Sequence, residues 1–495
     1  MQCVIINPED VVAVALSDLK KGSVVSTAAG EITLADDITF GHKFALRDIA
    51  KDEPIIKYGY PIGRAVCAIK KGAHVHSHNV RTNLKGAGSY EYCKTEPAVL
   101  RKSSVTTFEG YLRPDGQVGI RNEVWIIPTV FCVNHIAREL EAYARQKLDL
   151  YAHVDGCYAL THPYGCSQMG EDQTTTQKIL SCFCRHPNAG AVLVLGLGCE
   201  NNNIEVFKKY LDPDDDRLMF LNTQDVEDEL ESGFAVMDRL LEKASSCSRQ
   251  PVPLSKLRIG LKCGGSDGLS GITANPLIGR VSDLLVAAGG TSVMTEVPEM
   301  FGAEQILMNR AVSEDVFRQT VSLINDFKEY FRSHGETVSE NPSPGNKAGG
   351  ITTLEDKSLG CVQKGGKAEV NGVVRYGDTV RNSGLNLLQA PGNDGVSCSA
   401  LAAAGCHLIL FSTGRGTPFS TVIPTIKIST NTALYEKKGG NWIDFNAGSV
   451  VDGANFDELA DELLDYIVSI ASGESSVSEK RGFHEMLIWK DGVTM

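Results

Sequence analysis

Short apolar runs alternate with longer amphipathic stretches over most of the chain. Residues 191–196 form a continuous apolar run, as expected for a strand buried on both faces of a parallel sheet. Residues 133–147 and 313–333 carry apolar positions at helical spacing, and Ser313 can cap the second stretch while Gly335 follows its end. Strands that alternate with helices in this way predict α/β domains with mainly parallel sheets.

The same pattern predicts further elements. Strands are expected at 124–130, 257–263, 291–295, 407–411 and 423–428, and helices at 275–288 and 456–471. The longest mostly apolar stretch, 398–411, is interpreted as a buried helix followed by a strand.

The first 95 residues show a different pattern. Segments 15–25, 45–56 and 65–75 each run from an apolar stretch into a turn with lysine and glycine or aspartate, and then into β-branched residues. Such segments are typical of short strands joined by turns. We therefore expect a small, mostly β domain at 1–95.

The rest of the chain divides by composition. A polar stretch with Pro97 and four Ser or Thr residues favours a linker at 96–110. A second α/β domain is then expected at 111–250 and a C-terminal α/β domain at 251–495, with another linker candidate at 245–254.

Composition narrows the function. The 495 residues exceed one ordinary domain, and 48 basic against 61 acidic side chains give a net charge of −13. This charge argues against binding of nucleic acid, and it would also repel a small anionic substrate unless Lys and Arg gather locally. No secretory signal or membrane-spanning run is visible, so a cytoplasmic protein with reduced thiols is expected, and a homodimer is the default assembly.

Three of the fourteen cysteines lie beside glycines at expected strand or loop ends: Cys166, Cys199 and Cys263. Thiolates there could hold iron, as a mononuclear site or as a cluster. The alternative is that each is a buried core residue, because free cysteine is among the most buried residue types. The chain has no CxxC spacing at these positions that would favour a metal.

Histidines alternate in the first domain at His74, His76 and His78. On a strand they would project to one face, where neutral imidazoles are common ligands of divalent iron, manganese or zinc. His42 could complete such a site. The alternative is a solvent-exposed polar face of the strand.

The C-terminal half holds the candidates for acid–base chemistry: Lys347, Lys357, Glu296 and Glu355. Lysine and carboxylate can exchange protons with a substrate if burial brings their pKa values toward neutrality. The alternative for each lysine is an ordinary solvated surface charge.

Candidates for substrate binding lie in turns. Arg415, in a Gly-Arg-Gly turn, and Arg121 with Asn122 could bind a carboxylate. Ser266 and Asp267 lie in a glycine-rich loop after an expected strand, where α/β proteins usually bind ligands. No phosphate-binding loop or dinucleotide fingerprint is present.

Ten segments taken together resemble the altronate/galactarate dehydratase family, over essentially the whole chain. They are GHKFAL (41–46), KYGYPIG (57–63), HVHSHNVRTN (74–83), VGIRNE (118–123), YGCSQ (164–168), GLGCENN (196–202), KCGGSDGLSGITANP (262–276), TEVPEMFGAEQ (295–305), ENPSPGNKAGGITTLEDKSLG (340–360) and FSTGRGTP (411–418). Three of them, HVHSHNVRTN, the Arg-Asn pair of VGIRNE and GCENN, are more similar to the members that act on altronate.

The resemblance implies a multi-domain protein with a β-clip domain of the SAF type followed by α/β domains. It implies conversion of D-altronate to 2-dehydro-3-deoxy-D-gluconate and water in hexuronate breakdown, with Fe(2+) that Mn(2+) can replace. Removal of the weakly acidic C2 proton needs a base, loss of the C3 hydroxyl needs an acid, and a metal can stabilise the charge that develops on the carboxylate.

Two alternatives stay open at this point. One is a related lyase that acts on galactarate or on a sulfonated hydroxy acid. The other is a non-catalytic sensor that binds a sugar acid with the same Arg and Lys residues but needs no metal.

Overall fold

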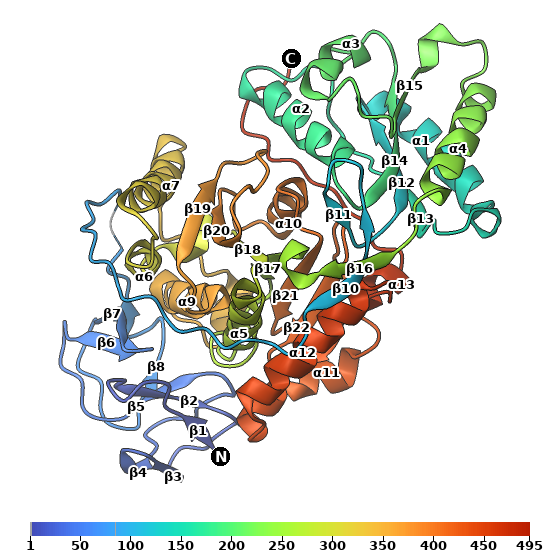
Figure 1. Cartoon of the computed structure of the whole chain (residues 1–495). Coiled ribbons are helices and arrows are strands. Elements are labelled where there is room, and N and C mark those ends of the chain that lie inside the picture. The colour runs from blue at the N-terminus through green and yellow to red at the C-terminus, as the bar shows by residue number, and fades with distance from the viewer. Residues whose placement is uncertain (1, 85) are drawn as a thin grey trace.

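The computed structural model describes residues 2–84 and 86–495. It contains an N-terminal β unit, a middle α/β unit and a larger C-terminal α/β unit (Figure 1). The two α/β units each have a parallel sheet, so the predicted fold class is confirmed.

The N-terminal unit consists of short antiparallel strands. They are β1 (Cys3–Val4), β2 (Val12–Ala15), β3 (Val24–Thr27), β4 (Gly30–Thr33), β5 (Lys43–Ala45), β6 (Pro54–Lys57), β7 (Tyr60–Ala65), β8 (His74–Val75) and β9 (Val80–Arg81). The turns of the sequence repeat contain Gly22 and Gly72 at positive φ. A Cβ on Gly72 would lie 2.2 Å from the Thr33 carbonyl oxygen, so this turn requires glycine.

The histidine segment differs from its prediction. Strand β8 ends at Val75, and residues 76–79 form a turn before β9. The turn forms because the Asn79 side chain accepts a hydrogen bond from the His76 amide and donates one to the His74 carbonyl. His74 and His76 therefore belong to a strand end and a turn, and they do not share one continuous strand.

The segment after the N-terminal unit is extended and packs on the C-terminal unit. The Tyr92 ring stacks on Phe317, and its hydroxyl donates to the Ala311 carbonyl at 2.6 Å. The expected linker at 96–110 is shorter than predicted, because strand β10 (Thr107–Leu112) begins inside it.

The middle unit has a parallel sheet in the order β13-β12-β14-β15. The strands are β12 (Glu123–Pro128), β13 (Gly156–Ala159), β14 (Ala189–Gly196) and β15 (Leu218–Asn222). The helices α1 (Asn134–Arg145) and α4 (Glu229–Ser245) pack on one face, and α2 (Glu171–Cys184) packs on the other; α3 (Ile204–Phe207) follows β14. Every residue of β14 is buried, as its apolar run predicts.

A small antiparallel sheet joins the middle and C-terminal units. Strand β10 lies between β11 (Val118–Gly119) and β16 (Gln250–Pro253). The linker predicted at 245–254 is therefore wrong. Its two prolines, Pro251 and Pro253, are tolerated because β16 is an edge strand of this sheet.

The C-terminal unit has a parallel sheet in the order β19-β20-β18-β17-β21-β22-β23. Its strands are β17 (Arg258–Cys263), β18 (Thr291–Met294), β19 (Val370–Val374), β20 (Gly384–Leu388), β21 (Leu408–Thr413), β22 (Thr425–Ser429) and β23 (Phe445–Asn446). Its helices are α5 (Ala274–Ala287), α6 (Glu304–Met308), α7 (Glu314–Ser333), α8 (Pro344–Ala348), α9 (Leu354–Cys361), α10 (Asp394–Ala403), α11 (Thr432–Lys438), α12 (Phe456–Ala471) and α13 (Val477–Lys480). Ser313 caps α7 by accepting from the Val316 amide, as predicted.

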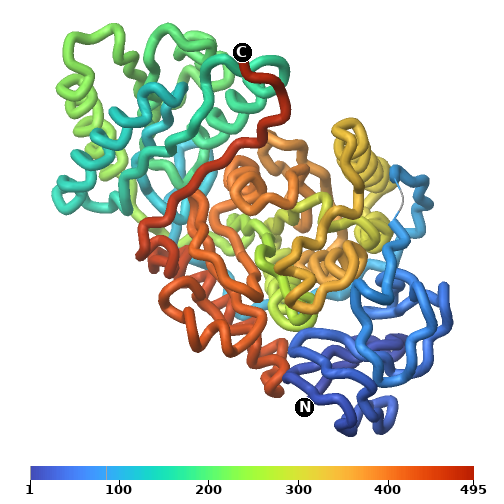
Figure 2. Tube along the Cα trace, turned by 180° about the vertical axis from the view of Figure 1, so that it is seen from behind, coloured from blue at the N-terminus to red at the C-terminus, as the bar shows by residue number. Residues whose placement is uncertain are grey.

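The three units share cores. Helices α5 and α12 pack together on one face of the large sheet, while α10 lies between that sheet and α2 of the middle unit. The last residues return from the C-terminal unit to the middle unit, as both views show (Figures 1 and 2). There the Met495 amide donates to the Ser167 carbonyl at 2.8 Å. No helix within the described residues has the length and apolar character needed to span a membrane.

Candidate active site

The candidate active site lies where the N-terminal unit packs on the C-terminal unit, in and beside the carboxyl edge of the large sheet. Three glycine segments approach each other closely at this junction. The Gly268 amide donates to the Gly349 carbonyl at 2.7 Å, and a Cβ on Gly350 would lie 2.2 Å from the Gly41 carbonyl oxygen. Ligands of parallel α/β sheets usually bind at this edge.

A buried group of lysines and carboxylates, here called the lysine–carboxylate cluster, occupies the ends of β17 and β18. Its members are Lys262, Glu296, Glu299, Lys357 and Lys364. Lys364 Nζ lies 2.6 Å from Glu296, Lys357 Nζ lies 2.7 Å from Glu299, and Lys262 pairs with Glu296. All five are buried, so the opposite charges stabilise each other in a region that water scarcely reaches.

The backbone at Glu296 contributes to this arrangement. Strand β18 ends at Met294, and Glu296 has φ 72°, a left-handed conformation that is uncommon for a residue other than glycine. The conformation turns the chain at the strand end, and the Glu296 carboxylate accepts hydrogen bonds from the Cys263 amide and from Lys364. Residues held in this region at a strand end are often functional.

Two buried thiols border the cluster. The sulfurs of Cys263 and Cys361 lie 3.6 Å apart, and each is 3.4 Å from Glu299 Oε2. The hydrogen bond with Cys263, together with burial, raises the pKa of the Cys361 thiol well above its usual value. Lys357, opposed by burial, holds the pKa of Glu299 at about 2.

A second ionic group connects the N-terminal unit to α9. Asp356 lies 2.8 Å from Lys43 Nζ and 2.9 Å from Lys57 Nζ, and all three are buried. Burial and the charge of Lys57 lower the pKa of Lys43 to about 8, although Asp356 opposes the shift. A buried lysine whose pKa approaches neutrality can act as a base.

The imidazoles of His42, His74 and His76 meet beside this group. His42 Nδ1 lies 3.0 Å from His74 Nε2, and the His76 ring centroid is 4.9 Å from that of His42. Burial and the neighbouring His42 lower the pKa of His74 to about 4, and burial and Lys43 lower that of His76 to about 3. The His78 ring also contacts His74, with ring centroids 5.4 Å apart.

Two donor sets are therefore candidates for a metal ion. Cys263, Glu296, Glu299 and Cys361 offer ligand atoms within 4.8 Å of one another, but three lysine ammonium groups already neutralise the carboxylates there, and a divalent cation would lie against them. The histidine set is neutral, because its lowered pKa values keep the imidazoles unprotonated, and imidazoles bind metals in the neutral form. The 3.0 Å between His42 Nδ1 and His74 Nε2 also matches two adjacent ligands at bonds of about 2.1 Å. His42 and His74 can thus supply two neighbouring ligands to a metal ion, whereas the three imidazoles together do not form a group of ligand atoms within 4.8 Å of one another as the Cys263, Glu296, Glu299 and Cys361 set does.

Several other predicted residues lie close by. Glu355 accepts hydrogen bonds from the Thr82 hydroxyl and the Asn83 amide, and burial raises its pKa. Ser266 and Lys357 line a narrow crevice between the two units, together with Lys57. Lys347 is exposed in the last turn of α8.

Asp267 and Arg415 lie on the loops at this edge. Asp267 is buried and accepts hydrogen bonds from Thr430, Ser270 and Asn431, so it fixes the loop. Arg415 is exposed beside Gly265 and forms no ion pair with any residue that the structure describes. Its guanidinium is therefore available for an anion at the rim of the site.

The structure does not bring Arg121 and Asn122 to this site. The Arg121 guanidinium donates to Glu479, to the Ile470 carbonyl and to the Glu474 carbonyl, which joins the middle unit to the C-terminal unit. The Asn122 side chain is bonded to Arg113 and to backbone carbonyls. Neither residue has a donor left for a substrate carboxylate.

The predicted cysteine trio is divided between two units. Cys263 borders the lysine–carboxylate cluster of the C-terminal unit, whereas Cys166 and Cys199 lie on loops of the middle unit's sheet. The two groups belong to different parallel sheets, so one metal ion cannot bind all three.

Sequence reasoning did not single out several members of the site. They are Lys43, Lys57, Lys262, Glu299, Asp356, Cys361 and Lys364. The signals were present, because Lys43 follows His42, Lys262 precedes Cys263 at a strand end, and Asp356 lies between Glu355 and Lys357. The pairing of Lys43 and Lys57 with Asp356 spans about 300 residues and could not be read from the sequence.

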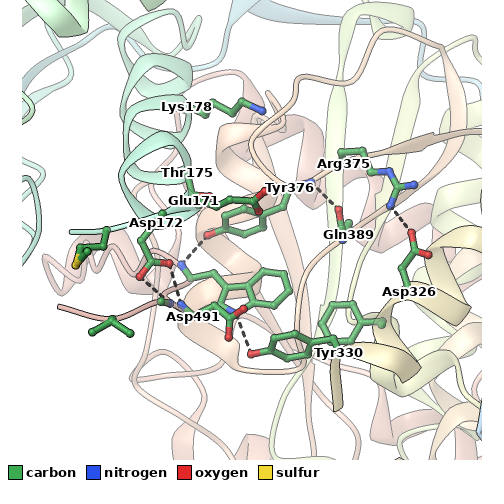
Figure 3. A pocket seen from close by; sticks show the side chains of 16 residues that line it. Glu171, Asp172, Thr175, Lys178, Asp326, Tyr330, Arg375, Tyr376, Gln389 and Asp491 are labelled. Atoms are coloured by element: carbon green, nitrogen blue, oxygen red, sulfur yellow. Dashed lines mark hydrogen bonds and ion pairs between the residues drawn. The ribbon is translucent and has the colours of Figure 1, made fainter. Parts of the chain in front are cut away.

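A separate cavity of about 780 Å³ lies between α2, α7 and the C-terminal segment (Figure 3). Its walls include Lys178, Arg375 and Tyr376, and Arg375 pairs with Asp326 at 3.1 Å. None of its lining residues is among those predicted for the site, and the volume alone does not make it the reaction centre.

Comparison with known families agrees with this organisation. Residues 1–83 match the altronate/galactarate dehydratase SAF domain, residues 110–245 match the D-galactarate dehydratase/altronate hydrolase second domain, and residues 254–494 match the D-galactarate/altronate dehydratase C-terminal domain. The chain belongs to the altronate/galactarate dehydratase family.

Relatives within this family align over the full length. The chain is 50% identical to the altronate dehydratase of Escherichia coli strain K12 over 100% of both chains, and 51% identical to that of Bacillus subtilis strain 168 over 99% of both. It is 33% identical to the galactarate dehydratase (L-threo-forming) of Escherichia coli strain K12, over 92% of this chain and 90% of that one. The resemblance inferred from the ten sequence segments is confirmed.

Proposed function

We propose that this chain dehydrates D-altronate to 2-dehydro-3-deoxy-D-gluconate. The observation that supports this most strongly is the full-length identity of about half to two altronate dehydratases, against a third to a galactarate dehydratase. Membership of the family favours a hydro-lyase over a non-catalytic sensor. The dense set of buried lysines and carboxylates at the junction supports the same choice, because a sensor has no use for an acid–base group.

The proposed cofactor is Fe(2+), which Mn(2+) can replace, held by His42, His74 and His76. When bound there, the ion would stabilise negative charge on the substrate carboxylate and the neighbouring hydroxyl oxygen. The Arg415 guanidinium at the rim would bind the carboxylate by paired hydrogen bonds.

The chain's own residues supply the proton transfers. Lys43, with its pKa near 8, is proposed as the base for the C2 proton, and Asp356 stabilises the resulting ammonium group. Lys357 lines the crevice between the units, and Glu299 raises its pKa, so that it stays protonated. Lys357 is therefore proposed as the acid that protonates the departing C3 hydroxyl. The enol product then tautomerises to the 2-keto acid.

A panel of sugar acids tests the substrate. Protein loaded with Fe(2+) under anaerobic reducing conditions is assayed for 2-keto acid formation from D-altronate, galactarate, D-gluconate and a sulfonated hydroxy acid. We expect the highest kcat/KM with D-altronate. A higher kcat/KM with another acid, or binding of D-altronate without turnover, would contradict the proposal.

Assembly and location are proposed on simpler grounds. All fourteen cysteines are free among the described residues, which fits a reducing compartment such as the cytoplasm. A homodimer is proposed because two-fold assemblies are the commonest among soluble enzymes. Light scattering on the purified protein distinguishes a dimer from a monomer.

A further inference from the structure

A second group of thiols lies on the middle unit, away from the site described above. Cys132, Cys166 and Cys199 follow the strands β12, β13 and β14 respectively. These three strands are neighbours in a parallel sheet. Their following loops therefore emerge at the same edge, which is the edge where such sheets bind ligands.

Hydrogen bonds hold the three loops against one another. The Phe131 amide, beside Cys132, donates to the Tyr164 carbonyl at 2.9 Å. The Asn202 amide donates to the Gly165 carbonyl at 3.1 Å. Asn201 accepts from Cys166 Sγ at 3.4 Å. Each cysteine is thus within three residues of a bond that joins its loop to the next.

The exposure of these thiols is not explained by packing. Cys132 and Cys199 are exposed and Cys166 is half-buried, whereas eight of the fourteen cysteines are buried. A cysteine that only fills space is normally buried. Three accessible thiols on interlocked loops are instead suited to binding a soft metal centre.

The three loop sulfurs do not form a group in which all lie within 4.8 Å of one another, which bears on the kind of centre they can bind. A single ion with metal–sulfur bonds of about 2.3 Å would draw its sulfurs to within roughly 3.8 Å of each other. Among the described residues, the ligand atoms of Cys263, Glu296, Glu299 and Cys361 lie within 4.8 Å of one another. The three loop cysteines do not form such a group. An iron–sulfur cluster places several metal and sulfide atoms between its thiolates, so it accommodates a wider separation.

The surroundings favour the negative charge of thiolates. Helix α1 begins two residues after Cys132, and α2 begins five residues after Cys166. The N-terminus of a helix stabilises nearby negative charge. Met169 and Gly170, next to the Cys166 loop, also line the cavity between α2, α7 and the C-terminal segment.

We infer that Cys132, Cys166 and Cys199 bind an iron–sulfur cluster on the middle unit. Each of the three thiolates would coordinate one iron of a four-iron cluster. The fourth iron would then have no protein ligand and could bind water or a small oxygen ligand. This site is separate from the histidine site proposed for Fe(2+), and it does not depend on the identity of the sugar-acid substrate.

The test measures the cluster itself. The full chain is incubated anaerobically with iron, sulfide and dithiothreitol, desalted, and analysed for iron, acid-labile sulfide and the broad absorption near 400 nm. We expect close to four irons and four sulfides per chain beyond any histidine-bound iron. Single variants Cys132→Ser, Cys166→Ser and Cys199→Ser should each lose most of the sulfide and the absorption.

Matched controls keep the result specific. Cys67→Ser and Cys93→Ser remove exposed thiols elsewhere on the chain, and both should retain the cluster. Because Cys132 and Cys199 are exposed and Cys166 lies only at the border of the middle unit's core, circular dichroism should show that all five variants fold. Wild-type protein without acid-labile sulfide, or equal sulfide in the loop and control variants, would overturn the inference. A single zinc or iron ion without sulfide would also overturn it.

Discussion

The two parallel sheets of this chain are built alike, yet their carboxyl edges carry different chemistry. The edge of the C-terminal sheet holds buried lysines, carboxylates and two buried thiols, and the N-terminal unit covers it. The edge of the middle sheet holds accessible thiols and amides, and the last residues of the chain, rather than a separate domain, pair with the loop that carries Cys166. The two edges therefore offer different chemical groups to a ligand, although the sheets that present them are built alike.

The largest effect expected at the covered edge comes from Lys357→Met. Loss of the proposed acid should lower kcat for D-altronate by about 1,000-fold, because general acid catalysis contributes on that order. Metal content should stay unchanged, since Lys357 is outside the histidine set. Lys209→Met, on the exposed surface of the middle unit, is the control and should keep wild-type kcat. A tenfold or smaller fall for Lys357→Met would remove Lys357 from the mechanism.

The next effect separates stability from catalysis. Arg121→Ala should reduce the free energy of unfolding by about 3 kcal/mol, because it leaves the buried Glu479 carboxylate unpaired. KM for D-altronate should change little in the folded fraction. Denaturant unfolding followed by steady-state kinetics measures both quantities, with Arg318→Ala, which removes an exposed ion pair with Glu314, as the control. A raised KM without loss of stability would return Arg121 to the substrate site.

Arg415→Ala should show the reverse pattern. We expect KM for D-altronate to rise about 30-fold, with an unfolding midpoint close to wild type, because Arg415 is exposed and forms no ion pair with the described residues. Arg415→Lys should recover only part of the affinity, since ammonium cannot bind a carboxylate by two parallel hydrogen bonds. An unchanged KM in Arg415→Ala would place the carboxylate elsewhere.

The smallest effect concerns the opposite end of the middle sheet. Glu123 begins β12, and burial raises its pKa to about 8, while the Trp125 indole donates to it at 2.7 Å. The folded state therefore binds one more proton than the unfolded state between about pH 4.5 and 8, so its stabilising contribution is present at low pH and is lost as pH rises through 8.

The isosteric variant Glu123→Gln should remove that dependence. It should match wild type near pH 4.5 and exceed it in free energy of unfolding by on the order of 2 kcal/mol at pH 8.5. Urea unfolding across this pH range measures the difference. Parallel pH profiles for the two proteins would show that Glu123 does not titrate in this way.

Elements with a clear period were predictable from the sequence. The apolar run at 191–196 became β14, and the amphipathic stretch at 313–333 became α7 with its Ser313 cap. The prediction of a linker at 245–254 was wrong, because prolines are compatible with an edge strand as well as with a loop. The prediction that His74, His76 and His78 share one strand was wrong, because the Asn79 side chain stabilises a local turn that the alternation of residues does not reveal.

The site was predictable only in part. Glu296 and Lys357 were singled out from the sequence, and the structure places both in one buried cluster, where Lys357 pairs with Glu299 and Glu296 pairs with Lys364, while their roles as acid or base stay predictions. Arg121 could not be distinguished from a substrate ligand by sequence, because its partner Glu479 lies more than 350 residues away. The cysteine trio was divided because three strand ends of similar composition belong to two different sheets.

The central claim is that the reaction takes place at the junction of the N-terminal and C-terminal units, with the metal on the histidines. The most direct test is Mn(2+) binding, followed by electron paramagnetic resonance, in wild type, His76→Ala and Glu299→Gln, with His135→Ala as an exposed control. We predict that wild type, Glu299→Gln and His135→Ala bind one Mn(2+) per chain and that His76→Ala does not. Retention of Mn(2+) by His76→Ala together with its loss in Glu299→Gln would place the metal in the lysine–carboxylate cluster and contradict the account.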